Sequence, residues 1–420
     1  MRHVANILYL VHRMPYPPNK GDKVRSYHLL RHLAARHQVY LGTFIDDPAD
    51  AVHIDTLKGL CTEAFIAPLN PLRSRLASLR GLVTGEPLTL PFYRHAGLRR
   101  WVQQTGARVS FDATVVFSSS MAQYLHAAPG VPALVDFVDV DSAKWTDYAP
   151  NHRWPLSWLY RREGRRLLAY ERAVAAQALH GFFATGKETA LFLNAAPECA
   201  GRVSAINNGV DANYFSPSPD RVSPFKLNEM SIVFTGAMDY WPNVDAVTWF
   251  AREALPVLRR SRPQLRFYIV GRAPSPAVLA LASDSVVVTG TVPDVRPYLQ
   301  HAAAVVAPLR LARGIQNKVL EAMAMGRPVV AAQACAEALD VTVGSEILSA
   351  ATSDDFVREV ESLLDAPDQA ACIGHAGRAR VLRSYDWAAH LSLMDRHVDL
   401  AQGERPTRPL PSTLAAQVVQ

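Results

Sequence analysis

Apolar and polar positions alternate along this chain in blocks, and the blocks fall into two successive series. In the first half, short apolar runs predict strands at 7–11, 39–44, 113–117, 133–138, 181–184 and 203–206. The stretch 22–36 predicts a helix whose apolar face is formed by Val24, Tyr27, Leu30, Leu33 and Ala34. Because helix-length segments separate the strands, we expect a parallel sheet covered by helices on both faces.

The second half repeats this pattern after a turn-rich connection. Strands are predicted at 232–235, 267–270, 286–288, 304–307 and 329–331, and helices at 243–260, 293–302 and 318–325. The connection, 207–219, is rich in Asn, Gly and Pro. We therefore predict two doubly wound α/β domains, at 1–207 and 225–384, joined by a linker at 208–224. A last helix is predicted at 385–401, and a disordered, Pro-rich tail at 402–420.

Length and composition fit two soluble domains. The chain has 420 residues, of which 49% are hydrophobic and 20% charged. Four cysteines lie far apart without a C-x-x-C spacing, which indicates a reducing compartment and excludes a disulfide framework. The apolar run 7–11 is too short for a signal peptide or a membrane span and reads as a buried strand, so we expect a cytoplasmic protein.

Positive charge is concentrated in the first half of the chain. Residues 1–180 contain 22 lysines and arginines against 14 aspartates and glutamates. Aromatic and basic residues interleave at 153–172, and a second basic patch lies at 73–100. Such segments suit the anionic inner surface of a membrane, although helix packing with a solvated basic rim is an open alternative. No nucleic-acid-binding signature is present.

The segment 310–330 holds the strongest candidate site. Asn317, Lys318 and Glu321 fall where a helix is predicted to begin, and a helix N-terminus favours anions. Lys318 and Glu321 are three positions apart and share one helix face. The lysine suits a phosphate, and the glutamate suits a pair of hydroxyls. The preceding loop adds Arg310, Arg313 and Gly314. The pattern predicts a nucleotide-sugar pocket; a solvated surface pair is the alternative.

Two places in the first half carry further candidates. Gly21 lies in the first strand–helix turn, where Lys23 and Arg25 are equally well read as solvated residues. Asp139 and Asp141 follow the strand 133–138 and would share one side if that strand continued. We favour sugar or acceptor recognition over a structural cap for these carboxylates, and no ligand set for a metal is evident. Sites of open α/β sheets lie at the carboxyl ends of strands, so a cleft between the domains is expected.

The segment 310–330 also resembles the donor-site motif of retaining GT-B glycosyltransferases of family 4. Glu321 stands at the second glutamate of that motif, which holds the ribose hydroxyls, whereas Arg313 occupies the position of the first glutamate. The linker N-G-V-D-A-N-Y-F-S-P resembles the interdomain signature of the same family. In the phosphate loop at 234–247, Gly236 matches, but Ala237 and Pro242 replace the usual cations.

This resemblance assigns further roles. Arg272, Arg310, Arg313 and Lys318 are the cations available in place of the two missing ones. Val292 and Pro293 match the loop that borders the base. Asp139 falls nearest to a position where the family often has a histidine that contacts the donor sugar. The implied fold is GT-B, with two Rossmann-like domains facing across a cleft and a last helix that crosses back onto the first domain.

The motifs together most resemble the sugar transferases associated with the PEP-CTERM/exosortase exopolysaccharide system. The implied activity is a metal-independent, retaining hexosyl transfer from a UDP- or GDP-sugar to a lipid-linked glycan at the inner face of the plasma membrane, with no cofactor. Arg313, Lys318 and Asp139 would act at the reacting centre. Two alternatives stay open, a nucleotide-sugar 2-epimerase on the same fold and a non-catalytic assembly factor associated with the membrane.

Overall fold

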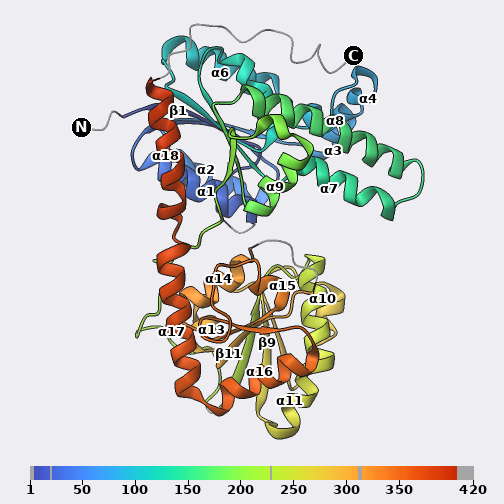
Figure 1. Ribbon diagram of the computed structural model, residues 1–420, viewed down its shortest axis with the longest axis vertical. Helices are drawn as coiled ribbons and strands as arrows, with labels where there is room; N and C mark the ends of the chain where they lie inside the picture. The colour runs from blue at the N-terminus through green and yellow to red at the C-terminus, as the bar shows by residue number, and fades with distance from the viewer. Residues whose placement is uncertain (1–3, 19–20, 228, 311–314, 404–420) are drawn as a thin grey trace. The chain divides into compact units, whose positions relative to one another are not determined.

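The chain divides into two compact units. The computed structural model describes residues 4–18, 21–227, 229–310 and 315–403. Unit 1 comprises the described residues up to Asn207 together with those from Leu391 onward, and unit 2 comprises the described residues from Asn208 to His390. Each unit is built around one parallel sheet with helices on both of its faces (Figure 1).

The sheet of unit 1 has the strand order β3-β2-β1-β4-β5-β6-β7, and all of its strand pairs are parallel. The strands are β1(Asn6–Val11), β2(Gln38–Ile45), β3(Glu63–Pro68), β4(Ala113–Phe117), β5(Ala133–Val138), β6(His180–Phe183) and β7(Val203–Ala205). Apolar side chains on both faces of the central strands β1 and β4 are buried, as expected for a parallel sheet covered on two sides.

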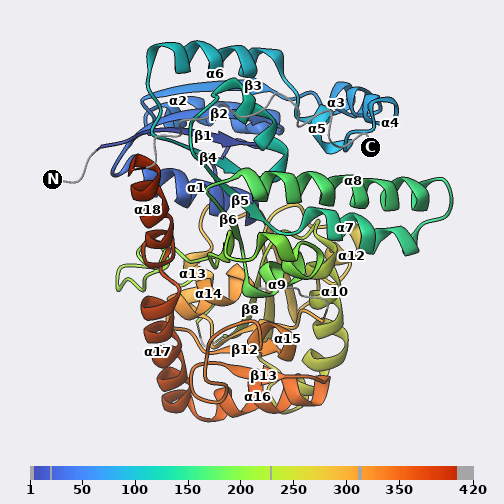
Figure 2. The ribbon, with the colours of Figure 1, turned by 45° about the horizontal axis from the view of Figure 1, so that its top comes forward.

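Helices cover both faces of this sheet. They are α1(Gly21–Ala34), α2(Ile54–Lys58), α3(Pro71–Ser78), α4(Arg80–Thr84), α5(Thr89–Phe92), α6(Ala96–Arg108), α7(Asp141–Tyr148), α8(Leu156–Gln177), α9(Gly186–Ala195) and α18(Trp387–Gly403). Figure 2 shows α1 and α6 on opposite sides of the strands. The last helix, α18, is held to unit 1 by ion pairs between its Asp395 and both His32 and Arg36.

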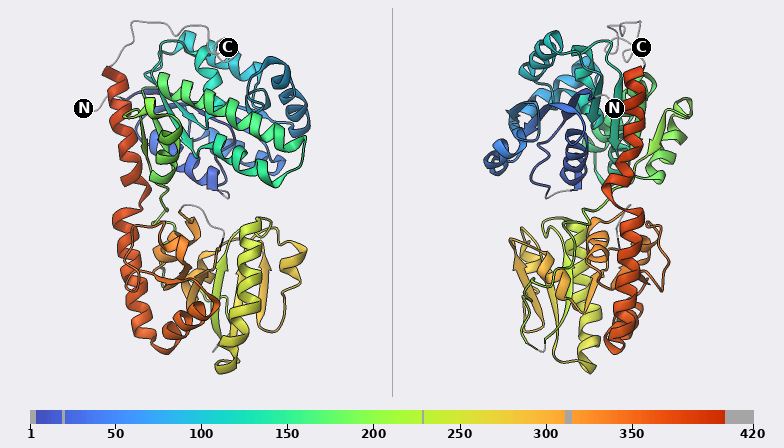
Figure 3. Two further views of the ribbon diagram at one scale, coloured as in Figure 1. Left: turned by 45° about the vertical axis from the view of Figure 1, so that its right-hand side comes forward. Right: turned by 90° about the vertical axis from the view of Figure 1, so that its left-hand side faces the viewer.

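Unit 2 has a six-stranded sheet with the order β10-β9-β8-β11-β12-β13, again entirely parallel. Its strands are β8(Met230–Thr235), β9(Leu265–Val270), β10(Val286–Gly290), β11(Ala304–Ala307), β12(Val329–Ala332) and β13(Leu348–Ala350). Its helices are α10(Trp241–Trp249), α11(Leu255–Ser261), α12(Pro276–Leu279), α13(Arg296–His301), α14(Asn317–Ala324), α15(Gln333–Ala336), α16(Ser353–Asp365) and α17(Pro367–Ser384). Figure 3 shows α17 and the α10–α11 stretch on different sides of this sheet.

Three helical predictions need correction. The predicted helix at 243–260 is interrupted by a π-helical turn, η5(Phe250–Ala254), because Pro256 at the start of α11 has no N–H to donate. The predicted apolar face of α1 is also rotated: Leu30 and Leu33 are buried as expected, but Leu29 joins them, while Val24, Tyr27 and Ala34 are only partly covered. The helix predicted at 293–302 is shorter in the structure, where α13 runs from Arg296 to His301.

Lys23 and Arg25 are buried, so reading them as solvated residues is wrong. The ammonium of Lys23 pairs with Asp50, and both side chains are nearly inaccessible to solvent. The guanidinium of Arg25 donates to both carboxylate oxygens of Asp136 at 2.8 and 3.1 Å, and to the carbonyl of Ile206 at 2.6 Å. Arg25 thus links α1 to the carboxyl end of β5 and to Ile206, the residue that follows β7.

The strand that precedes Asp139 and Asp141 ends where it was predicted to end. β5 stops at Val138, whose φ is +69°, a left-handed conformation rare for a β-branched residue. Asp141 then begins α7 instead of extending the strand. The strand therefore does not continue through Asp139 and Asp141, and the condition for a shared strand face is not met. Both carboxylates nevertheless contact the ammonium of Lys144, at 2.8 and 3.0 Å.

Candidate functional site

Two glycines bring the carboxyl ends of β8 and β9 into backbone contact in unit 2. Gly236 follows β8 with φ +155°, and its N–H donates to the Val270 carbonyl at 3.0 Å. Gly271 follows β9 with φ +154°, and a Cβ there would lie 1.7 Å from the Gly236 carbonyl oxygen. Only glycine fits at position 271, and the positive φ of Gly236 also favours glycine.

Lys318 reaches this glycine turn from the first turn of α14. A Cβ at Gly236 would lie 2.8 Å from both Lys318 Nζ and Asn243 Nδ2. The Lys318 ammonium donates to Asn243 Oδ1 at 2.5 Å and lies 4.1 Å from the centroid of the Phe234 ring. Asn243 in turn donates to the Ala237 carbonyl at 2.8 Å. The structure therefore places Gly236 and Lys318, predicted from sequence, side by side.

The N-terminus of α14 is arranged to receive an anion. Its N-cap residue, Gln316, makes no side-chain capping hydrogen bond, and the first turn carries no acidic residue. Within the described ranges, the buried Oδ1 atom of Asn317 has no hydrogen-bond partner. Exposed N–H groups at a helix start, together with the positive end of the helix dipole, favour negative charge.

Burial shifts the pKa of both charged side chains on α14. Burial lowers the pKa of the Lys318 ammonium to about 7, although the carboxylate of Glu321 partly opposes this shift. Burial likewise raises the pKa of the Glu321 carboxyl to about 7, against the opposing effect of Lys318. Neither side chain is a solvated surface group, which contradicts the surface-pair reading. Among described residues, none donates a hydrogen bond to the Glu321 carboxylate, so its oxygens can accept from ligand hydroxyls.

The remaining predicted cations of unit 2 have different surroundings. Arg272 follows Gly271, and within the described chain its buried Nε atom has no hydrogen-bond partner. Arg310 is paired with Asp245 at 2.6 Å and lies 5.6 Å from the Trp249 ring centroid, so its charge is already balanced. Arg313 and Gly314 fall outside the described residues. Their assigned roles stay predictions.

Val292 and Pro293 follow β10, as predicted for the loop that borders a base. The side chain of Val292 is partly buried against the core of unit 2, and Pro293 is exposed. The next residues are fixed by Asp294, which accepts from the Arg296 N–H at 2.9 Å and pairs with the guanidinium of the same residue. The turn that follows Val292 and Pro293 is thus fixed by Asp294.

In unit 1, the carboxyl ends of β1, β4 and β5 border a pocket of about 640 Å³. Asp139 lies in its lining, beside Asp141 and Lys144. Gly21 does not line it; this glycine begins α1, and a Cβ built on it would meet no atom within 4 Å. The predicted glycine therefore has no steric requirement within its own unit.

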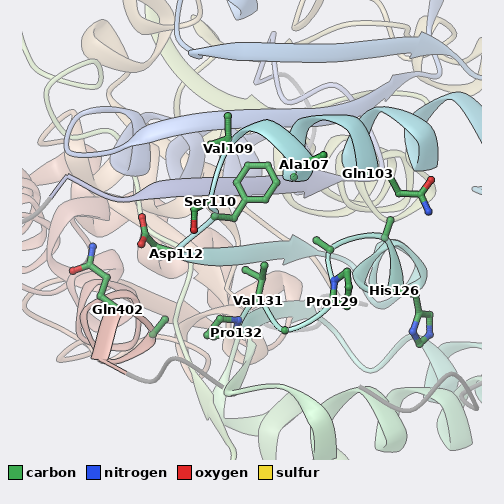
Figure 4. A pocket seen from close by; sticks show the side chains of 16 residues that line it. Gln103, Ala107, Val109, Ser110, Asp112, His126, Pro129, Val131, Pro132 and Gln402 are labelled. Carbon is green, nitrogen blue, oxygen red and sulfur yellow. The ribbon is translucent and has the colours of Figure 1, made fainter. Parts of the chain in front are cut away.

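A larger groove of about 1130 Å³ lies at the opposite, amino edge of the same sheet (Figure 4). Figure 4 shows Ser110 and Asp112 before β4, Val131 and Pro132 before β5, and Gln402 near the end of α18. Ligands of open α/β sheets bind at the carboxyl edge. The smaller pocket is therefore the better candidate for function.

Metal-ligand clusters and membrane spans are absent from the described part of the chain. Across these residues, no group of three or more His, Cys, Asp or Glu side chains is arranged to hold a metal ion. No helix in the same ranges combines the length and apolar character needed to cross a bilayer.

Two parallel α/β units, one with a glycine turn beside a helix N-terminus, are typical of the GT-B class of fold. Residues 229–366, which make up most of unit 2, match the family model described as glycosyl transferases group 1. Unit 2 is therefore similar to group 1 glycosyltransferases, and the two parallel α/β sheets confirm the predicted fold class. No curated protein matches the chain in sequence.

Solved glycosyltransferase structures share this fold along nearly the whole chain. The HepE protein of Anabaena, solved with UDP, is 16% identical, with a TM-score of 0.66 over 94% of this chain and 100% of its own. Sucrose-phosphate synthase from Thermosynechococcus elongatus is 18% identical, with a TM-score of 0.68 over 95% of this chain and 100% of its own. WaaG, a glycosyltransferase involved in lipopolysaccharide biosynthesis, is 17% identical, with a TM-score of 0.61 over 95% of this chain and 100% of its own.

Sequence reasoning missed two contributors to these sites. Asn243 bridges Lys318 to the loop after β8, and it is a buried polar residue in a helix that is otherwise apolar on this side. Arg25 donates hydrogen bonds to both carboxylate oxygens of Asp136. Its spacing of four residues from Leu29 and eight from Leu33 was a signal that it shares their buried helix face.

Proposed function

We propose that this protein transfers a sugar from a UDP- or GDP-sugar, with the donor diphosphate bound in unit 2. The observation that carries the proposal is the convergence of the glycine turn at Gly236, the Lys318 ammonium and the open N-terminus of α14. A nucleoside diphosphate fits a glycine turn, a cation and a helix dipole together. HepE, which shares the fold, has been solved with UDP-glucose, which supports UDP as the carrier.

In this proposal, different residues of unit 2 contact different parts of the donor. Lys318 and the N–H groups of α14 stabilise the charge on the diphosphate as it leaves, and Arg272 adds a second cation. Glu321 accepts hydrogen bonds from the two ribose hydroxyls, while the backbone at Val292 and Pro293 borders the base. No protein nucleophile is assigned, so the leaving phosphate assists substitution on the same face and the anomeric configuration is retained.

We further propose that the acceptor is a lipid-linked glycan at the inner face of the plasma membrane, in exopolysaccharide synthesis of the PEP-CTERM/exosortase type. The exposed apolar surface of α3 supports membrane contact: Leu72 and Leu76 are 71% and 69% exposed, next to Arg73 and Arg75. Apolar side chains flanked by arginines suit an anionic bilayer surface. The fold's likeness to WaaG is in keeping with a glycolipid acceptor.

A panel of UDP- and GDP-sugars tests the proposal through thermal stabilisation and product analysis. A ligand at 100 times its dissociation constant adds about 2.7 kcal/mol to the stability of the folded protein. We expect one sugar of the panel to stabilise the wild type and Glu321→Ala to abolish the shift, with unchanged melting in the absence of ligand. Equal stabilisation of both proteins would refute the role of Glu321.

Product analysis separates the related activities. Incubation of the protein with the stabilising nucleotide sugar alone should leave the sugar unchanged at C2, because transfer requires an acceptor. Epimerised sugar in that sample would identify an epimerase. Binding without turnover on any lipid-linked acceptor would identify a non-catalytic protein.

A further inference from the structure

Tyr214 belongs to the turn-rich segment that precedes β8 in unit 2, and its side chain is 45% exposed. Hydrogen bonds fix the backbone around it. The Asp211 carboxylate accepts from the Tyr214 N–H at 2.9 Å, and the Asp211 carbonyl accepts from the Phe215 N–H at 2.8 Å. An aspartate that bonds the backbone ahead of it is a common device of tight turns. The exposed ring therefore starts from an ordered piece of backbone.

The ring of Tyr214 is held by Arg296 at the start of α13. The guanidinium carbon of Arg296 lies 3.9 Å from the centre of the ring, and Nη1 donates to the Tyr214 carbonyl at 3.2 Å. Nε of the same guanidinium donates to both carboxylate oxygens of Asp294, at 2.9 and 3.0 Å. A cation over a tyrosine ring is attractive, and this one is fixed in place. Tyr214 therefore lies beside the turn that follows Val292 and Pro293, the residues proposed to border the base.

The same segment is joined to α14 through Arg378 of α17. Nη1 of Arg378 donates to the Phe215 carbonyl at 3.2 Å and also to the Ala324 carbonyl. Ala324 lies three positions after Glu321, so the two residues are neighbours along one side of α14. Tyr214 is thus linked both to α13 and to the helix that carries the proposed ribose carboxylate.

The hydroxyl group of Tyr214 is available to a ligand. In the part of the chain that the structure describes, this hydroxyl has no hydrogen-bond partner, although the ring itself is fixed. Burial raises the pKa of the hydroxyl against the opposing charge of Arg296, and Glu321 is one of two carboxylates that raise this pKa further. The hydroxyl is therefore protonated at neutral pH and lies within range of the Glu321 charge.

A ribose needs hydrogen-bond partners of both kinds, because each of its hydroxyls can donate one bond and accept others. The ionised carboxylate of Glu321 can accept from two hydroxyls, but it has no proton to donate. The ammonium of Lys318, on the same helix face, is already directed to Asn243. The protonated hydroxyl of Tyr214 has the donor that a ribose bound to Glu321 lacks.

From this arrangement we infer that Tyr214 is a further donor-binding residue, whose hydroxyl donates a hydrogen bond to a ribose hydroxyl held by Glu321. The inference rests on the proposed function, in which Glu321 binds the ribose. Tyr214 then contributes to the selection of ribonucleotides over deoxyribonucleotides and has no contact with the diphosphate. A nucleotide bound in unit 2 would also contact the segment that leads into this unit.

Calorimetric titration of the full chain tests this contact with UDP, 2′-deoxy-UDP, 3′-deoxy-UDP and inorganic pyrophosphate. The variant Tyr214→Phe keeps the ring against Arg296 and removes only the hydroxyl. We expect it to bind UDP about fivefold more weakly, the effect of one lost hydrogen bond, and to bind pyrophosphate as the wild type does. The preference for UDP over one of the two deoxynucleotides should shrink by the same factor, because that deoxynucleotide has no bond to Tyr214 to lose.

Tyr148→Phe is the matched control, because this tyrosine is 55% exposed and belongs to unit 1. All three proteins should melt at the same temperature without ligand. Unchanged UDP affinity in Tyr214→Phe would overturn the inference. An equal loss for UDP, both deoxynucleotides and pyrophosphate would also overturn it, because such a loss reports a general change of the site. In both cases the wild type still binds UDP and the proposed function stands, whereas a wild type that binds neither UDP nor pyrophosphate would contradict the proposed function as well.

Discussion

Lys318 and Glu321 share one face of α14, and burial moves the pKa of both side chains to about 7. The proposed donor needs the ammonium for its diphosphate and the carboxylate for its ribose. Below pH 7 the carboxyl group gains a proton, and above pH 7 the lysine loses one. The affinity for a UDP-sugar should therefore peak near neutral pH and fall by up to about tenfold per pH unit on each side.

Calorimetric titration of the wild type and of Lys318→Arg across this range checks the assignment. Arginine stays protonated, so the variant should lose the decline on the alkaline side while keeping the decline on the acidic side. A UDP-sugar is a suitable ligand because it has no phosphate monoester that titrates near pH 6. Identical pH profiles for the two proteins would show that Lys318 does not contact the diphosphate.

Among single residues, those with a local signal could be predicted and those defined by tertiary contacts could not. Gly236, Lys318 and Glu321 stand at recognisable distances from strand ends and a helix start, and the structure brings the first two together. Asn243 lies 75 positions from Lys318, and the two side chains meet only in the folded unit. The pairing of Arg25 with Asp136 likewise joins residues 111 positions apart.

At the scale of elements, the glycine contact between the loops after β8 and β9 fixes the shape of the donor site. A Cβ at position 271 would lie 1.7 Å from a backbone oxygen, and no side-chain rotation relieves such a clash. Gly271→Ala should therefore destabilise unit 2 by at least about 2 kcal/mol and weaken nucleotide binding. Gly186→Ala, where a Cβ meets no atom within 4 Å, is the control. Equal melting temperatures for both variants would contradict this view of the turn.

The exposed helix α3 carries a prediction of its own. None of its side chains is buried, so Leu72→Glu and Leu76→Glu together should leave folding intact while reducing co-sedimentation with anionic vesicles. The residual binding should also fall as salt is added, because screening weakens the contribution of the arginines. Val222→Glu, at an 81% exposed position of unit 2, is the control for added charge. Unchanged co-sedimentation of the α3 variant would remove this helix from the membrane contact.

Elements with a strong apolar period were predicted closely, and weakly patterned ones were missed. Ala113–Phe117, Ala133–Val138 and Ala304–Ala307 coincide with their predicted strands because each consists mainly of buried apolar residues. β3 was missed because only one of its six residues, Ala67, is fully buried, and β13 because it has three residues. Neither helix periodicity nor strand alternation is expressed in a segment that buries as little as β3 or is as short as β13.

At the scale of the whole molecule, the account places the nucleotide in unit 2, where α14 offers Lys318 and a first turn without acidic residues to a diphosphate. The two series of strands and helices in the sequence predicted the two-unit organisation. The ion pairs of Arg13 with Asp22 and Asp46 in unit 1 were not predictable, because these side chains meet only in the folded unit.

The central claim is that the diphosphate of a nucleotide sugar binds between Gly236 and the start of α14. Hydrogen–deuterium exchange of the full chain, with and without UDP, locates that contact directly. We predict slower exchange in peptides that cover 234–238 and 317–321, and unchanged exchange in those that cover β4 and β5. Protection confined to other segments, or none in these two peptides at saturating UDP, would contradict the claim.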